Sequence, residues 1–390
     1  MDNIKKDLNN EQFRVGMMTW SMDEMKTGIP YYIYELIQEF KKENHSSNLY
    51  LYHWSGRGAE SIYENTHEIA LKSLPCRISS FSNLPFAIKK SKIDILHLPV
   101  PTLNQIIPAF LNRNTKQVMT VHDVAPHLFP EMYTKKAVYS FDLSIKISKK
   151  IVNQYIVISK NTKNDLIKYY GIPEELISVI YLGKNSHFFP AKNKAEIRSN
   201  LAKKLNLPIE EPYILSVGTL EPRKNIPGLL KAYSWLKKDG LKTKMVIVGM
   251  KGWKYNPIFD LIKTLDLEND VIFPGYVTDE DIQSFYQGAE IFVFPSFYEG
   301  FGFPPLEAMA CGIPVIVSNS SSIPEVVGKA GIQINPNSTT ELASAMENLL
   351  RSKEKQIYFS EEGIKQAALF SWEKTAEETW KVYEKLAREK

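Results

Sequence analysis

The sequence predicts an α/β protein of two domains, each built on a parallel β-sheet with helices on both faces. Short apolar runs alternate with longer amphipathic segments along the whole chain, as buried parallel strands and their connecting helices do. The length of 390 residues exceeds a typical domain of roughly 100 to 200 residues and suits two. A polar, proline-punctuated stretch over residues 188–211 separates two such alternating series.

Short apolar runs carry the strand prediction in each domain. In the first they are Val15–Trp20, Leu49–His53, Ile93–Leu98, Gln117–Val121, Tyr155–Ile158 and Ile177–Tyr181. In the second they are Tyr213–Val217, Lys244–Val248, Val271–Phe273, Ile291–Phe294 and Val315–Val317. Helical patterns such as Pro30–Lys41 and Lys135–Lys150 lie between them. We therefore expect domains over residues 1–187 and 212–365, a linker over 188–211, and a C-terminal helix within 366–390 that packs back on the first domain.

Composition narrows the class of protein. Hydrophobic residues make up 44% and charged residues 24%, which is ordinary for a globular chain. The net charge of +4 is too small to suggest a nucleic-acid partner. Two cysteines, Cys76 and Cys311, do not make a disulfide framework and favour a reducing cytoplasm. The start, Met1–Arg14, lacks the apolar core of a signal peptide, and no window reaches the roughly 20 apolar residues of a membrane span.

The most informative segment follows a predicted strand and opens a helix. It reads Phe294-Pro-Ser-Phe-Tyr-Glu-Gly-Phe-Gly-Phe-Pro-Pro-Leu-Glu-Ala-Met-Ala-Cys-Gly312. Gly300 and Gly302 permit a tight turn and a close approach of backbone to a ligand. Pro304 and Pro305 suit the first helical turn, where the missing N–H groups cost little. The helix start is therefore a natural seat for a phosphate.

Two carboxylates accompany this turn. Glu299 lies on the loop and Glu307 is expected in the first helical turn, so both are expected to face one cleft. Carboxylates accept hydrogen bonds from the vicinal hydroxyls of a sugar or a ribose. For an isolated pair, a solvated glutamate and a helix-dipole partner would be the simpler interpretation. The glycine loop and the paired prolines favour the ligand site.

A pair of cations follows the first strand of the second domain. Arg223 and Lys224 are expected at the start of a helix that runs to about Lys238. Arginine offers a planar fork to phosphate oxygens, and lysine offers a point charge. Two solvated surface cations are the alternative, but the strand-to-helix position favours a phosphate site.

These segments resemble retaining glycosyltransferase family 4, which has the GT-B fold of two Rossmann-like domains whose sheets face across a cleft. Its signature is a Glu, seven residues and a second Glu, as at Glu299 and Glu307. Ser216-Val-Gly-Thr-Leu-Glu-Pro-Arg-Lys-Asn225 resembles the family's phosphate-binding strand, loop and helix. Further family-like segments are Thr120-Val-His-Asp123, Val157-Ile-Ser-Lys160 and Phe370-Ser-Trp-Glu373.

The resemblance implies roles for particular residues. Glu299 would contact the transferred sugar, Glu307 would hold the ribose, and Arg223 and Lys224 would stabilise the leaving diphosphate. Many relatives carry Arg directly after the glycine, where this chain has Thr219, so Arg223 would supply that guanidinium. The remaining donor-binding candidates are Gly218, Gly249, Tyr276, Val277, Gly300, Phe301, Gly302, Phe303 and Leu306.

The first domain adds weaker candidates. Gly28 precedes the helical pattern that starts near Pro30, and the family has a glycine loop at this point. His122 follows a strand, and the resemblance implies that it contacts the donor sugar. Asp123 is expected as a turn residue, and His97 is considered for the acceptor.

The chemistry expected from the resemblance is transfer with retention on one face of the sugar. No carboxylate clearly fits the nucleophile of a retaining glycosidase. The Asp-Glu-Asp of residues 279–281 follows Thr278, and we interpret it as a capped helix start, not as a metal ligand set. We expect no cofactor and no obligatory metal.

The expected reaction moves a hexose from a nucleotide-sugar to a glycan or a lipid-linked acceptor, in cell-surface polysaccharide synthesis. Mannose from GDP-mannose is the first choice, because the Glu-Pro-Arg-Lys-Asn loop resembles those of polysaccharide-assembly mannosyltransferases. A UDP-sugar donor, a GT-B UDP-sugar epimerase and a non-catalytic binding subunit stay open as alternatives. Basic residues such as Lys89, Lys90, Lys146 and Lys150 leave contact with the inner face of a membrane open as well.

Overall fold

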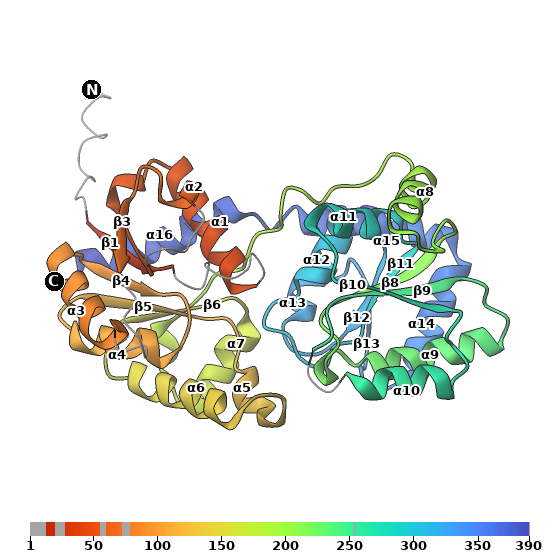
Figure 1. Ribbon diagram of the computed structural model, residues 1–390, viewed down its shortest axis with the longest axis horizontal. Helices are drawn as coiled ribbons and strands as arrows, with labels where there is room; N and C mark the ends of the chain where they lie inside the picture. The colour runs from red at the N-terminus through yellow and green to blue at the C-terminus, as the bar shows by residue number, and fades with distance from the viewer. Residues whose placement is uncertain (1–12, 20–27, 55–59, 72–78, 253–254, 390) are drawn as a thin grey trace. The chain divides into compact units, whose positions relative to one another are not determined.

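The computed structural model describes residues 13–19, 28–54, 60–71, 79–252 and 255–389. Trp20, Thr27, Cys76 and most of the segment Met1–Arg14 lie outside these ranges. The chain divides into two units (Figure 1). Unit 1 comprises Met1–Leu182 together with Trp372–Lys390, and unit 2 comprises Gly183–Ser371.

Unit 1 is built on a parallel sheet with the strand order β3-β2-β1-β4-β5-β6-β7. Its strands are β1 Val15–Met18, β2 Leu49–Trp54, β3 His67–Leu71, β4 Ile95–Leu98, β5 Lys116–Val121, β6 Gln154–Val157 and β7 Ile177–Val179. The central strands β1, β4 and β6 are buried along their whole length. They accordingly read as near-continuous apolar runs in the sequence.

Helices connect these strands. They are α1 Ile29–Lys42, α2 Glu60–Tyr63, α3 Ser79–Ser91, α4 Leu103–Leu111, α5 Ala125–Leu128, α6 Lys135–Ser148 and α7 Lys160–Asp165. A single π-helical turn, Leu166–Tyr170, extends α7. The helical patterns expected over Pro30–Lys41 and Lys135–Lys150 are thus confirmed within one or two residues.

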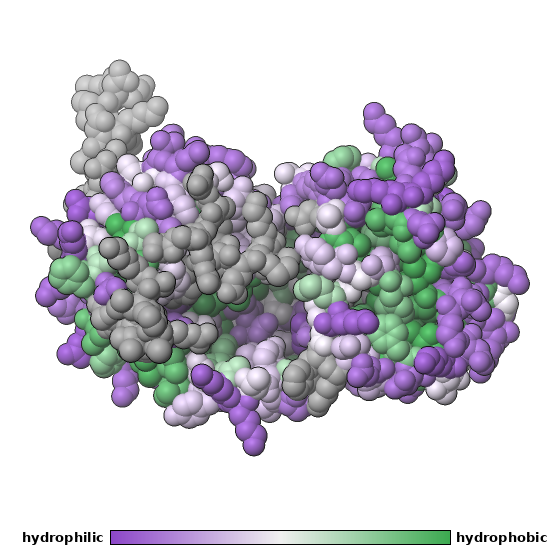
Figure 2. Space-filling model, in the orientation of Figure 1, coloured by the Kyte–Doolittle hydropathy of each residue, from purple (hydrophilic) through white to green (hydrophobic). Residues whose placement is uncertain are grey.

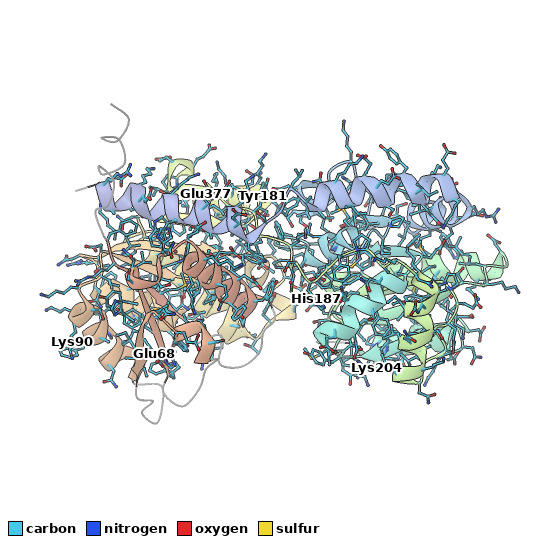
Figure 3. All side chains as sticks on the ribbon, turned by 90° about the horizontal axis from the view of Figure 1, so that it is seen from above. Glu68, Lys90, Tyr181, His187, Lys204 and Glu377 are labelled. Carbon is cyan, nitrogen blue, oxygen red and sulfur yellow. The ribbon has the colours of Figure 1, made fainter. Side chains whose placement is uncertain are left out.

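The C-terminal helix α16, Trp372–Arg388, joins unit 1 and packs against α1, β4 and β5. Its buried residues include Trp372, Ala376 and Tyr383, whose spacing defines one face of a helix. Glu377 of the same helix, labelled in Figure 3, is exposed and pairs with Lys381 at 2.6 Å. A segment at the end of the chain therefore completes the core of its first sheet.

Unit 2 repeats the architecture with the parallel order β10-β9-β8-β11-β12-β13. Its strands are β8 Tyr213–Val217, β9 Lys244–Val248, β10 Val271–Gly275, β11 Ile291–Phe294, β12 Val315–Ser318 and β13 Ile332–Ile334. Its helices are α8 Lys194–Leu205, α9 Ile226–Lys238, α10 Asn256–Thr264, α11 Asp279–Gly288, α12 Phe303–Ala310, α13 Ile323–Val327, α14 Thr339–Arg351 and α15 Lys353–Ala367. In the space-filling view, hydrophilic residues cover the upper and outer rim of this unit (Figure 2).

The structure adds an edge strand to each predicted sheet. β3 has only one fully buried residue, Leu71, so its sequence lacks the apolar run of a central strand. β13 is only three residues long. The segment 188–211, expected as a linker, contains α8 and belongs to unit 2, where Lys204 pairs with Asp281 of α11 at 2.6 Å.

The strand order of each sheet reverses direction at one point, between β1 and β4 and between β8 and β11. In open parallel sheets, ligands bind outside the carboxyl ends of the strands at such a point. In unit 2 the loops that leave this point are residues 218–225, after β8, and residues 295–302, after β11. These two loops carry the main candidates from the sequence.

Candidate active site

The loop between β11 and α12 carries Glu299 in a buried position. Glu299 is 7% exposed, and Ser296, three residues earlier, is fully buried. Gly302, with φ of 122°, ends the loop, and α12 begins at Phe303 with prolines in its first turn, as expected. Glu307 is the fifth residue of α12, so it lies just beyond the first turn, in which it was expected.

Three side chains bind the Glu299 carboxylate. Lys224 Nζ lies 2.7 Å from Oε1, and Arg223 Nη1 lies 2.7 Å from Oε2. The Ser296 hydroxyl donates to Oε1 at 2.5 Å. The two loops at the reversal point of the sheet are therefore joined by a buried, charge-assisted network.

Electrostatics favour the ionised form of Glu299 in this network. Burial raises the pKa of Glu299, but Lys224 and Arg223 outweigh it and hold the pKa of this carboxyl below its ordinary value. Burial lowers the pKa of Lys224, and pairing with Glu299 opposes that change. Glu221 adds a second carboxylate, 2.7 Å from Arg223 Nη2. Two cations and two carboxylates thus share the site.

Arg223 and Lys224 lie in a short 3-10 turn, Pro222–Lys224, and not in the helix itself. The sequence placed them at the start of that helix, but Asn225 adopts a left-handed conformation with φ of 53°, and α9 begins only at Ile226. The turn aims both cations towards Glu299, because the chain has not yet entered the helix. Lys224 Nζ also lies 4.9 Å from the centre of the Phe294 ring.

Two predicted glycines let neighbouring loops approach one another. A Cβ on Gly249, after β9, would lie 2.0 Å from the carbonyl oxygen of Gly218, after β8. A Cβ on Gly218 would lie 3.3 Å from the Lys224 side chain. A larger residue at position 249 would therefore push apart the backbone that carries the cations.

A serine triplet after β12 holds the Glu299 loop and was missed from the sequence. The Ser321 hydroxyl accepts the N–H of Glu299 at 2.9 Å. The Ser322 hydroxyl lies 2.8 Å from the Glu299 carbonyl oxygen and 2.7 Å from that of Phe301. Ser320 reaches the Phe297 carbonyl at 3.0 Å. Ser321 has φ of 53°, uncommon for serine, and only this local geometry could have signalled the role.

The other candidates in unit 2 differ in how far their side chains are buried. Glu307 is half-buried and accepts a hydrogen bond from Tyr286 of α11 at 2.8 Å. The Leu306 side chain is fully buried, so it is a core residue, and a ligand contact there would involve backbone. Phe301 is buried and packs edge-on against Phe303. Tyr276, which follows β10, is exposed, whereas Val277 beside it is half-buried.

His122 lies in unit 1, in the loop that follows β5. Its Nε2 lies 3.0 Å from the Pro99 carbonyl oxygen, to which it donates, and its ring meets Tyr32 edge-on at 5.0 Å. Burial lowers its pKa to about 4, so the imidazole is neutral at pH 7. The Asp123 carboxylate accepts the N–H of Ala125 at 2.9 Å, which confirms it as a turn residue.

The remaining candidates of unit 1 differ in accessibility. Gly28 has φ of 61° and directly precedes α1, where it is exposed. His97, considered for the acceptor, is fully buried, and both ring nitrogens are engaged by Tyr383 and Thr120. The idea that His97 faces the acceptor is therefore wrong, because the tail helix covers it.

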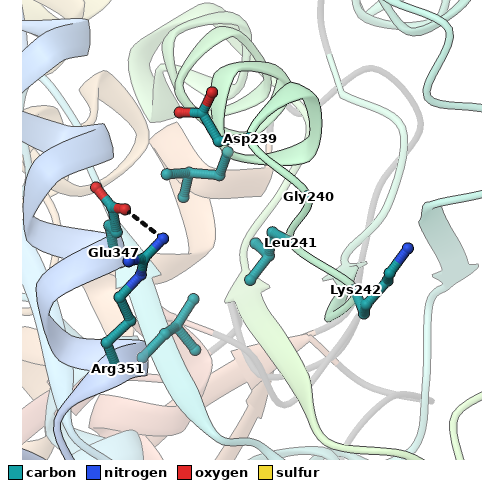
Figure 4. Close-up of a pocket in the computed structure, with 8 residues that line it drawn as sticks. Asp239, Gly240, Leu241, Lys242, Glu347 and Arg351 are labelled. Atoms are coloured by element: carbon teal, nitrogen blue, oxygen red, sulfur yellow. Dashed lines mark ion pairs between the residues drawn. The ribbon is translucent and has the colours of Figure 1, made fainter.

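Two features of unit 2 lie apart from this site. Thr278 caps α11 by accepting the N–H of Asp281 at 3.2 Å, which confirms the helix start expected for this acidic segment. A cavity of about 240 Å³ lies where α9 leads into β9, lined by Leu241 and by the Arg351–Glu347 ion pair (Figure 4). It lies at the amino end of β9, whereas Arg223 and Glu299 follow the carboxyl ends of their strands.

Comparisons with known proteins identify the class. A solved glycosyltransferase from Rickettsia africae matches with a TM-score of 0.76 at 21% identity, over 97% of this chain and all of that one. Anabaena Alr3699/HepE, solved with UDP and glucose, matches with a TM-score of 0.75 at 18% identity, over 95% and 99% of the two chains. These likenesses show the fold, and the expected GT-B class is confirmed.

Sequence relatives identify the family. The model "Glycosyltransferase Family 4" matches residues 27–186, and "Glycosyl transferases group 1" matches residues 197–366. The O-antigen chain mannosyltransferase B of Escherichia coli is 34% identical over 302 residues, 77% of each chain. The O-antigen chain mannosyltransferase RfbU of Salmonella typhimurium is 30% identical over 64% of each chain. The chain belongs to the family 4 glycosyltransferases and is an enzyme of that class.

Proposed function

We propose that this enzyme moves a hexose, with retention of anomeric configuration, from a nucleotide-sugar to a glycan or lipid-linked acceptor. The observation that carries the proposal is the buried network of Arg223, Lys224 and Glu299 at the reversal point of the second sheet. Fixed cations at this point suit a leaving diphosphate, because they stabilise negative charge without reorganising. A neighbouring carboxylate suits a sugar hydroxyl.

In this mechanism each group has one task. Arg223 and Lys224 bind oxygens of the diphosphate as the glycosidic bond breaks. Glu299, held ionised between them, accepts a hydrogen bond from the transferred sugar. Glu307 accepts hydrogen bonds from the ribose, with Tyr286 orienting its carboxylate from behind. Neutral His122 contributes a hydrogen bond to the sugar, not a charge.

Retention follows from reaction on one face of the sugar. The leaving diphosphate oxygen takes the proton of the incoming hydroxyl, so the acceptor enters on the side from which the leaving group departs. This path needs neither an enzymic nucleophile nor a metal ion. Nuclear magnetic resonance of the product tests it: an α-linked donor should give an α-linked product, and a β-linked product would overturn retention. Full activity in excess chelator is expected.

The donor we propose is GDP-mannose, and the pathway is cell-surface polysaccharide synthesis. Both similar enzymes of Escherichia coli and Salmonella typhimurium are named O-antigen mannosyltransferases, which favours mannose. A UDP-sugar is the alternative, favoured by the structural likeness to a protein solved with UDP and glucose. An epimerase or a non-catalytic subunit is disfavoured by the ionised Glu299 beside two cations.

Thermal unfolding with GDP, UDP and ADP tests the central claim. The nucleotide of the true donor at 100 times its dissociation constant should stabilise the protein by about 2.7 kcal/mol. Slow hydrolysis of the matching nucleotide-sugars then identifies the hexose. No response to any of the three nucleotides would remove the basis of the proposal.

We propose that unit 1 contacts the inner face of a membrane through the surface of α3 and α4. Exposed Phe86, Lys89 and Lys90 lie on α3, and exposed Leu111 ends α4, which packs against α3. Exposed Arg113 lies two residues after α4, and Lys90 extends from the surface of unit 1 (Figure 3). Basic and apolar side chains together favour anionic lipid surfaces. The enzyme should co-sediment with anionic vesicles but not with neutral vesicles. The double variant Lys89→Glu/Lys90→Glu should not co-sediment with anionic vesicles. None of the helices in the described part of the chain has the length and apolarity of a membrane span.

A further inference from the structure

Glu221 binds the edge of the Arg223 guanidinium formed by Nε and Nη2, which we call the outer edge. One carboxylate oxygen of Glu221 accepts from Arg223 Nε at 3.1 Å and from Nη2 at 2.7 Å. Glu221 is the residue before the Pro222–Lys224 turn, a position where Ser, Thr, Asp or Asn side chains usually accept a backbone N–H. Its side chain makes no such capping bond. The carboxylate is therefore directed to Arg223 and not to the turn.

The opposite edge of the same guanidinium is engaged inside the protein. Arg223 Nη1 donates to the Tyr298 carbonyl at 2.6 Å and to Glu299 at 2.7 Å. The Glu299 side chain is 10% exposed, whereas that of Glu221 is 24% exposed. Glu221 therefore binds the more accessible edge, which has the geometry that phosphate oxygens use when they bind arginine.

We infer that the Glu221 carboxylate competes with the nucleotide diphosphate for the outer edge of Arg223, which weakens nucleotide binding and speeds release of the product. The inference rests on the proposed function of this site. A carboxylate oxygen and a phosphate oxygen cannot both accept from Nε and Nη2 in the same position. The Glu221 charge also offsets one of the two cations, which lowers the attraction for an anionic ligand. Glu299 stays paired with Arg223 and Lys224 throughout.

Glu221→Gln tests the competition, because glutamine keeps the shape of the side chain and removes its charge. Isothermal titration calorimetry with GDP and UDP should show about fivefold tighter binding of the diphosphate that the wild type binds. The matching nucleoside, without phosphate, should bind unchanged. Glu211→Gln is the matched control, since this exposed carboxylate precedes β8, at the opposite end of the strand. It should leave both affinities unchanged.

A double-mutant cycle with Arg223→Gln separates competition from a general charge effect. The gain in diphosphate affinity from Glu221→Gln should largely disappear when Arg223 is replaced. A gain in affinity that persists in full would overturn the inference. Equal or weaker diphosphate binding by Glu221→Gln, confirmed with Glu221→Ala and with unchanged thermal unfolding, would also overturn it. If the wild type binds neither nucleotide, the proposed function itself fails.

Discussion

The polar networks beside the reversal points of the two sheets differ in charge. In unit 2 the network is charged, since Arg223, Lys224 and Glu299 form two ion pairs of 2.7 Å. In unit 1 the network is neutral: His97 Nε2 lies 2.7 Å from the Thr120 hydroxyl, and His97 Nδ1 lies 2.5 Å from the Tyr383 hydroxyl. Both networks lie near carboxyl ends of central strands.

The difference teaches what each network supports. A buried ion pair loses solvation that its attraction only partly restores, so it adds little stability, but it leaves strong fields at fixed positions. A neutral network has a smaller desolvation cost and holds elements together. Burial lowers the pKa of His97 to about 3, so it stays uncharged at neutral pH. We therefore assign charge stabilisation to unit 2 and hydrogen bonding to unit 1.

The largest effect is expected from Glu299→Gln, which removes the central charge of unit 2. Activity should fall by about 10² to 10³, because the sugar loses a charged acceptor and the two cations lose their shared partner. Initial rates with donor and acceptor measure the loss, with thermal unfolding as the check on folding. A loss below about tenfold would contradict the importance given to this carboxylate.

A smaller effect is expected on stability, whose dependence on pH should differ between the two units. The folded pKa of His97 is about 3 and that of His122 about 4, both below the ordinary 6.5, so the unfolded chain binds more protons in between. Unit 1 should therefore lose stability as pH falls below about 6.5, by at most about 1.4 kcal/mol per pH unit for each histidine. The folded pKa of Glu299 is also lowered, so its contribution is present above about 4.5 and is lost only at lower pH.

Hydrogen exchange measures this difference, with rates corrected for the intrinsic effect of pH. Amides of β4 and β5 should lose protection between pH 6.5 and 5, whereas those of β8 and β11 should not. His97→Phe should lower stability at pH 7 and flatten the pH dependence of unit 1. Equal losses in both units would contradict the contrast between charged and neutral networks.

The smallest effect is expected from Ser322→Ala, which removes the hydroxyl that binds the Glu299 loop. The carbonyls of Glu299 and Phe301 would lose their donor, at a cost of about 1 to 2 kcal/mol. Hydrogen exchange should speed up in residues 296–302, and activity should fall less than in Glu299→Gln. Ser338→Ala, which removes only the cap of α14, is the matched control for loss of a serine hydroxyl in unit 2. If it changes exchange in the Glu299 loop equally, the effect is not local.

The sequence predicts the features that depend on local order. Central strands read as apolar runs, and neighbouring residues predict the Pro304–Pro305 helix start and the Thr278 cap. The family resemblance names Glu299 and Lys224 as site residues, and the structure brings these two side chains together. The sequence did not predict the edge strands β3 and β13, because few residues of either strand are buried.

The sequence does not predict the features that depend on distant contacts. In the sequence, Ser320 to Ser322 look like an ordinary polar turn. Only the structure shows that they contact the Glu299 loop. His97 looked like a site residue because its partner Tyr383 lies 286 positions away. The direct pairing of Arg223 with Glu299 was likewise hidden, since the sequence suggested separate partners for the two side chains.

The return of α16 to unit 1 has a consequence for the order in which the chain folds. A ribosome releases residues 183–371 before Trp372–Arg388, so unit 2 has its complete sequence first. Until α16 emerges, His97 lacks Tyr383, and the surface of α1, β4 and β5 that it covers stays in water. The unit whose sequence begins first therefore finishes folding last, and a ribosome that stalls before it adds Trp372 leaves a nascent chain in which unit 2 can fold before unit 1 is complete.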